Sequence, residues 1–103
     1  TRTARMGTAF SHEGRMNLKN AKYTHDHGPL DDKCTCPVCT GGFTRAYIHH
    51  LVKQQEMVGA ILLSMHNIYF LLELMRQARA AIFAGTYKQF EDEWMASEAV
   101  RDF

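Results

Sequence analysis

The chain has 103 residues, a formal net charge of +1 and 46% hydrophobic residues, which is enough for one modest core. Its longest apolar stretch, residues 58–65, is broken by Gly59 and Ser64 and is far short of a membrane span. No signal peptide is evident, and the chain opens on Thr1 rather than Met, so we expect an intracellular piece of a larger protein.

The first predicted elements are two short strands, at residues 7–10 and 15–18, joined by a hairpin turn. A polar loop follows over residues 20–32, in which Gly28 and Pro29 mark a turn. Residues 34–42 then form a second loop, which carries every cysteine of the chain.

Helices are predicted for the rest of the chain. The first is expected over residues 44–57 with Thr44 as its N-cap, and Gly59 is expected to interrupt or bend the chain. A second helix runs to about residue 84, where Gly85 occupies the position of a C-cap glycine, and a short helix covers residues 87–95. Apolar residues at helical spacing on the second helix predict a face that packs on the rest of the protein.

The cysteines follow the pattern C-x-C-x-x-C, at Cys34, Cys36 and Cys39. Three thiolates on one short loop suit a soft divalent metal, and zinc takes His as the usual non-sulfur fourth ligand. The alternative is three free thiols. A disulfide is disfavoured because the cysteine count is odd and the spacings are too short for good bridge geometry. Unbridged thiols also fit a reducing cytosol, so a cytoplasmic location is expected.

Spacing alone leaves the fourth ligand open. His49 and His50 lie about a dozen residues after the last cysteine, as in many zinc fingers. His66 closes a larger loop and is expected to lie at the start of the long helix, which is a rigid place for a ligand.

Charge is distributed unevenly. Residues 1–22 contain five basic side chains against Glu13 alone, which suggests a nearby polyanion such as RNA. An ordinary solvated loop and hairpin is the alternative explanation of the same charges.

Several short motifs occur in a specific order, and together they cover essentially the whole chain. Because of this ordered set of motifs, the chain resembles the C-terminal part of a bacterial tRNA-guanine transglycosylase, also called queuine tRNA-ribosyltransferase. The motifs are Thr1-Arg2-Thr3-Ala4-Arg5-Met6-Gly7, Asn20-Ala21-Lys22-Tyr23, Gly28-Pro29-Leu30-Asp31, the three cysteines, Arg45-Ala46-Tyr47-Ile48-His49-His50-Leu51 and His66-Asn67.

The resemblance implies one structural zinc ion per chain, bound by Cys34, Cys36, Cys39 and His66. The implied fold class is α/β: the C-terminal fragment of a TIM barrel with a zinc-binding subdomain. Residues 1–22 would then be the end of a barrel loop and a hairpin that contacts RNA. Residues 23–66 would be the zinc-binding subdomain, and residues 67–103 the last barrel helix and a C-terminal helix.

The implied activity is exchange of the wobble guanine of tRNA for a 7-deazaguanine base through a covalent Asp–RNA intermediate. The nucleophile would precede Thr1, so no catalytic residue is expected here, and Asp26, Asp31 and Asp32 are interpreted as loop carboxylates near the metal. By the same resemblance, the anticodon loop and its wobble base are recognised by Thr1, Arg2, Thr3, Ala4 and Arg5.

Bacterial members of the family are homodimers, which implies an aromatic subunit contact through Phe43, Tyr47 and His50, residues spaced to share one helix face. Two other interpretations remain open from the sequence. One is a stand-alone zinc module for RNA or protein interaction. The other is a non-catalytic or archaeosine-type relative of the same family.

Overall fold

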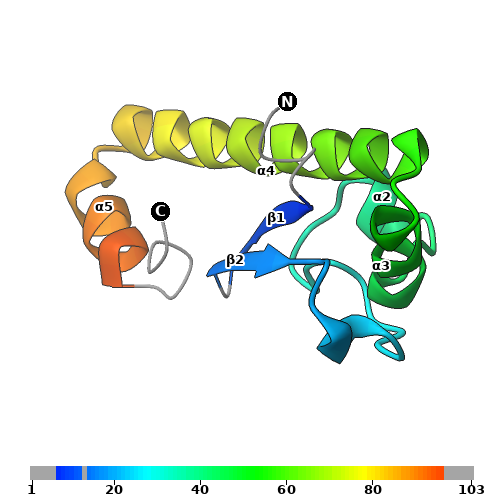
Figure 1. The fold of residues 1–103 in the computed structure, drawn as a ribbon. Coiled ribbons are helices and arrows are strands. Elements are labelled where there is room, and N and C mark those ends of the chain that lie inside the picture. Colours follow the sequence, from blue (N-terminus) through cyan, green and yellow to red (C-terminus); the bar gives the residue numbers. More distant parts are fainter. Residues whose placement is uncertain (1–6, 13, 97–103) are drawn as a thin grey trace.

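The computed structural model describes residues 7–12 and 14–96, and Figure 1 shows their arrangement. The long helix α4 runs along one side, the hairpin and α2 and α3 lie against it, and α5 folds back at its C-terminal end. The elements in chain order are β1 (Thr8–Ser11), β2 (Gly14–Asn17), the 3-10 turn η1 (Ala21–Tyr23), α2 (Pro37–Thr40), α3 (Arg45–Lys53), α4 (Met57–Ala84) and α5 (Tyr87–Ala96).

Strands β1 and β2 form a two-stranded antiparallel sheet in which Ala9 pairs with Met16. Each strand extends one residue further toward the turn than predicted, so that Ser11 pairs with Gly14, and the Ser11 hydroxyl donates a 2.7 Å hydrogen bond to the Gly14 carbonyl. Ala9 and Met16 are buried on the inner face. The predicted subdomain of hairpin, cysteine loop and helices is thus confirmed. Parallel barrel strands do not occur among residues 7–12 and 14–96.

The hydrophobic core is small and lies between the hairpin, the loops, α3 and the first half of α4. It contains Ala9, Met16, Leu18, Tyr23, Leu30, Cys36, Val38, Ile48, Leu62 and Leu63. Since one of the cysteines belongs to this core, the cysteine loop is part of the packing and not an appendage to it.

The predicted N-cap Thr44 is confirmed, since its hydroxyl accepts a 3.0 Å hydrogen bond from the Tyr47 backbone N–H. The predicted end of that helix at residue 57 is wrong. Helix α3 ends at Lys53, Gln55 adopts a left-handed conformation with φ of 56°, and α4 begins at Met57.

Gly59 therefore does not break the chain but lies in the first turn of α4. A Cβ atom there would lie 3.0 Å from Leu51 Cβ and 3.4 Å from the Leu51 carbonyl carbon. The glycine allows α3 and α4 to pack backbone against backbone. The C-cap role of Gly85 is confirmed by its left-handed φ of 75°.

Helix α4 has two different faces. Leu62, Leu63 and Phe70 are buried against the core. The predicted apolar face points outward in the described structure, and its members are 43–65% exposed: Ile61, Met65, Ile68, Leu72, Met75 and Ile82. Such a large exposed apolar surface indicates packing against something beyond the described residues.

By length and composition, α4 is the one helix in the described part of the chain that could cross a membrane. The apolar helix is thus longer than the eight-residue apolar stretch noted in the sequence. Core helices of globular proteins also meet these criteria. The absence of a membrane span stays a prediction.

Gly59→Ala should destabilise the protein by about 1–3 kcal/mol, because the added methyl group meets atoms close to the α3 backbone. Helix propensity alone predicts the opposite sign, with about 1 kcal/mol in favour of Ala. Urea unfolding of the wild type and variant measures the difference. A more stable Gly59→Ala protein would contradict the close helix contact.

Candidate metal centre

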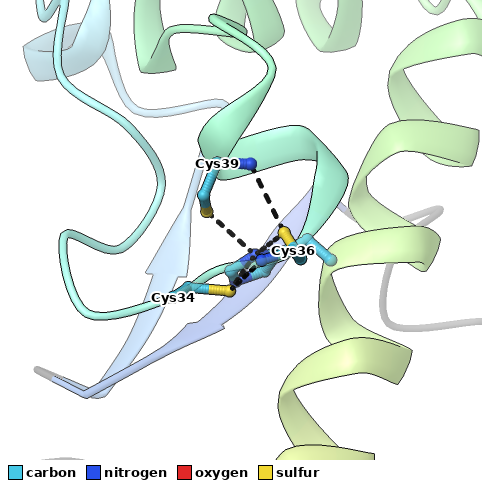
Figure 2. A group of neighbouring side chains, drawn as sticks. Cys34, Cys36 and Cys39 are labelled. Atoms are coloured by element: carbon cyan, nitrogen blue, oxygen red, sulfur yellow. Dashed lines mark hydrogen bonds between the residues drawn. The ribbon is translucent and has the colours of Figure 1, made fainter.

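The three cysteines are held by one short helical turn. Cys36 is the N-cap of α2, Pro37 occupies its first turn, and Cys39 lies within it. Two backbone N–H groups donate to sulfur at 3.4 Å, from Cys36 to the Cys34 Sγ and from Cys39 to the Cys36 Sγ. As Figure 2 shows, this local fold turns all three sulfur atoms toward one point.

His66 reaches the same point from α4. Its Nδ1 lies 3.7 Å from the Cys34 Sγ and 3.4 Å from the Sγ atoms of Cys36 and Cys39. In a tetrahedral zinc site the sulfur–nitrogen distance is about 3.5 Å, from metal bonds of about 2.3 and 2.0 Å. The four potential ligand atoms all lie within 4.8 Å of one another. The arrangement therefore fits a tetrahedral ion with three sulfurs and one nitrogen.

The orientation of the imidazole is set by a second contact. His66 is fully buried, and its Nε2–H donates a 2.6 Å hydrogen bond to the carbonyl of Phe10. A proton on Nε2 leaves the Nδ1 lone pair directed at the sulfurs, as is usual for metal-binding histidines. His66 lies in the interior of α4, so its predicted place at a helix start is wrong.

The structure does not bring the other two candidate histidines to the cysteines. The buried His49 has its Nδ1 2.6 Å from the carbonyl of Leu18 and its Nε2 3.4 Å from the Thr24 hydroxyl. His50 is exposed on α3. The interpretation of His49 or His50 as the fourth ligand is therefore not supported by the geometry.

Burial affects the protonation of this cluster. Desolvation raises the pKa of Cys34 to about 11 and raises the pKa of Cys39 still further. Burial also lowers the pKa of His66, which keeps its imidazole neutral. Without a metal the Cys34 and Cys39 thiols are protonated at neutral pH, so an ion that binds must displace their protons.

Asn67, the neighbour of the histidine, ties the same helix to strand β1. Its Oδ1 accepts a 2.9 Å hydrogen bond from the Phe10 N–H, and its Nδ2 donates to the Thr8 carbonyl at 2.9 Å. Sequence analysis missed this role, although the residue stands beside a candidate ligand and is a polar residue in an apolar helix.

Asp31 links the cysteine loop to the hairpin. Its carboxylate lies 2.5 Å from the His12 Nδ1 and accepts backbone hydrogen bonds from His12 and Lys33, while its carbonyl accepts the Cys34 N–H. Burial alone would raise the pKa of Asp31, but the hydrogen bonds outweigh it and the pKa is lowered. Its interpretation as a loop carboxylate near the metal is consistent with these contacts.

The predicted subunit contact lies on the surface of the described chain. The Phe43 and Tyr47 rings are 6.1 Å apart, Tyr47 is 46% exposed and His50 is exposed. Phe43 precedes the N-cap Thr44, so it flanks the helix and does not share a helical face with the other two. The predicted RNA-reading residues, Thr1 to Arg5, lie outside the described residues.

Fold and site together define a Cys₃His metal-binding subdomain. The family model for queuine tRNA-ribosyltransferase matches residues 1–99, and the chain belongs to this family.

Three curated queuine tRNA-ribosyltransferases illustrate the similarity. The protein of Novosphingobium aromaticivorans is 49% identical over 87% of this chain, that of Lactiplantibacillus plantarum 47% over 99%, and that of Methylibium petroleiphilum 44% over 96%. These alignments cover 24%, 27% and 26% of the three relatives. The chain therefore spans about a quarter of the length of the relatives it matches.

His66→Ala should lose the metal, whereas His50→Ala should keep one zinc per chain, because the imidazole of His66 is the one directed at the sulfurs. Elemental analysis of protein purified without chelators measures the metal content. Cys36→Ser should also lose zinc and unfold the loop, since metal binding in such sites contributes to folding. Metal retained in His66→Ala but lost in His50→Ala would contradict the assignment.

Proposed function

We propose that this chain is the C-terminal, zinc-binding and tRNA-recognising part of a queuine tRNA-ribosyltransferase. The observation that supports it most is the convergence of the distant His66 with the loop cysteines Cys34, Cys36 and Cys39, in a chain that matches this family almost throughout. The complete enzyme exchanges the wobble guanine of tRNA for a 7-deazaguanine base in queuosine biosynthesis. Its Asp nucleophile and its general acid/base belong to the rest of the protein.

The metal has a structural role in this proposal. Four protein ligands leave no open position for a water molecule, so the ion supplies cross-linking and no Lewis-acid chemistry. The Nε2–H of His66 donates a hydrogen bond to the carbonyl of Phe10, and the side-chain amide of Asn67 binds the same strand. The site thus fixes strand β1, which follows directly after the segment proposed to read RNA.

Three parts of the chain have different roles. Residues 1–22 contact tRNA, with Thr1 to Arg5 at the wobble base, and residues 23–66 form the metal subdomain. Residues 67–103 provide the last helix of a TIM barrel and a C-terminal helix, and the rest of that barrel belongs to the remainder of the protein. These three parts differ in role and are not separate structural domains, because α4 continues without a break across the boundary between residues 66 and 67. The exposed apolar residues of α4 supply the surface that the barrel covers.

The exposed Tyr47 and His50, with Phe43 beside them, form the proposed homodimer contact in a cytoplasmic enzyme. A stand-alone zinc module is the alternative function. The exposed apolar face of α4 favours the larger enzyme, since an independent module would leave that surface in water.

An exchange assay tests the proposal. The gene is extended upstream to the length of the relatives, and incorporation of labelled guanine into tRNA is measured for the long protein and for the 103-residue chain. We expect exchange by the long protein and none by the chain alone, which lacks the carboxylates that the reaction needs. Absence of exchange by the folded, zinc-loaded long protein would refute the proposed function.

Arg2→Ala or Arg5→Ala in the long protein should weaken productive tRNA binding and leave thermal stability nearly unchanged. Loss of a base-edge contact should cost roughly 1–3 kcal/mol, whereas loss of a phosphate contact should reduce the salt dependence. Because these arginines are proposed to contact RNA and not a core, each substitution should change stability by no more than about 0.5 kcal/mol. Wild-type affinity and turnover in both variants would remove this segment from the RNA site.

A further inference from the structure

A small cavity of about 70 Å³ lies beside the metal centre, between the cysteine loop, α4 and α5. Of the four candidate ligands, all of which belong to the described residues, Cys34 alone lines this cavity. Cys36 and His66 are fully buried, whereas Cys34 is partly exposed. The cavity therefore reaches the metal centre at Cys34.

Cys34 is also the ligand that regular secondary structure constrains least. Cys36 is the N-cap of α2 and Cys39 lies within that helix, while His66 lies in the interior of α4. Cys34 precedes α2 and lies outside any helix or strand. Its sulfur can thus move away from the other three ligand atoms without unwinding a helix.

A hydrogen bond next to Cys34 holds this part of the loop on α4. The hydroxyl oxygens of Thr35 and Tyr69 lie 2.6 Å apart, and both residues line the cavity. Thr35 stands between the ligands Cys34 and Cys36. Tyr69 follows His66 by three residues, so the two share one face of α4. The Thr35–Tyr69 bond, which we name the latch, therefore joins the two segments that supply the metal ligands.

The cavity is too small for an ion to pass while its wall stays in place. A volume of about 70 Å³ holds about two water molecules, at roughly 30 Å³ each, and a zinc ion with its water shell needs more. The aromatic part of the wall is packed, since the buried Phe70 ring lies 6.2 Å from that of Trp94 and 5.4 Å from that of His12. The part that can move is the loop at Cys34 and Thr35, which the latch holds.

We propose that the latch controls metal exchange: when the Thr35–Tyr69 bond opens, Cys34 detaches first and the ion passes through the widened cavity. The step is a ligand exchange without oxidation, in which the ion loses the Cys34 sulfur and gains a ligand from solvent. Tyr69 is then a positioning residue of the metal centre, which acts through the loop and does not touch the ion. This role concerns the metal centre alone and goes beyond the proposed function.

The test uses the long protein loaded with zinc and follows release of the ion to an excess of a colorimetric chelator, 4-(2-pyridylazo)resorcinol. The variants are Tyr69→Phe, which removes only the hydroxyl, Thr35→Val and the double substitution. Each single substitution should speed release roughly two- to tenfold, the effect of losing one neutral hydrogen bond. Because both remove the same bond, the double variant should release zinc no faster than the faster single variant.

Two controls show whether the hydroxyl pair is responsible. Thr35→Ser keeps a hydroxyl at this position and should retain the slow release. Tyr87→Phe removes a hydroxyl from α5, at a residue that does not line the cavity, and should not change the rate. Thr35 is exposed, so Thr35→Val gives the answer even if Tyr69→Phe fails to fold. Unchanged zinc release in the folded Thr35→Val variant would overturn the inference.

The order in which the ligands detach is tested by labelling the zinc-loaded protein with limiting iodoacetamide and locating the label by mass spectrometry. We expect Cys34 to be modified before Cys36 and Cys39, and sooner in Tyr69→Phe than in the wild type, at a nearly unchanged melting temperature. Labelling of the three cysteines together, or of Cys39 first, would mean that the ion leaves by global unfolding or by another route, and the latch would be wrong.

Metal release and base exchange can fail separately. A long protein that exchanges no base but releases zinc faster as Tyr69→Phe refutes the proposed function and supports the latch. A long protein that exchanges base, and whose zinc release is the same in the wild type, Tyr69→Phe and Thr35→Val, refutes only the latch.

Discussion

The structure depends most on the paired side chains of His66 and Asn67 in the interior of α4. One imidazole faces three sulfurs with Nδ1 and a strand carbonyl with Nε2, and the adjacent amide binds the same strand twice. A two-stranded sheet alone is only marginally stable in water. Here its first strand is fixed to a long helix, and the same helix closes the metal site.

The position of this pair in the helix explains how a small core is sufficient. Only the first half of α4 contributes buried leucines to the core, and the cysteine loop contributes Cys36 and Val38. A second set of contacts holds the intervening loop, since Arg45 bonds Asp26 and Leu30 while Asp31 bonds His12. Loop, hairpin and helix are thus joined by partly buried polar contacts, which are costly to break where they leave a desolvated partner behind.

The sequence predicted what is local and repetitive. Thr44 and Gly85 were recognisable as caps, and three cysteines on one turn indicated a metal. It could not choose between the pair His49 and His50 and the distant His66 by spacing, because loop length does not determine which imidazole faces the sulfurs. The family resemblance made that choice. Gly59 was misinterpreted as a break, since a close helix crossing and a chain break both favour glycine.

The long helix shows why such a chain resists interpretation from hydrophobicity alone. Its apolar residues form two sets, one facing the core and one exposed, so a single amphipathic stripe could not have described it. A helix that is apolar on most of its surface needs partners on more than one side. In the described residues the polar pair, His66 and Asn67, marks the side that binds the metal subdomain. The opposite set, from Ile61 to Ile82, then marks the side that we assign to the remaining three quarters of the enzyme, so that one helix connects the metal subdomain to the catalytic part.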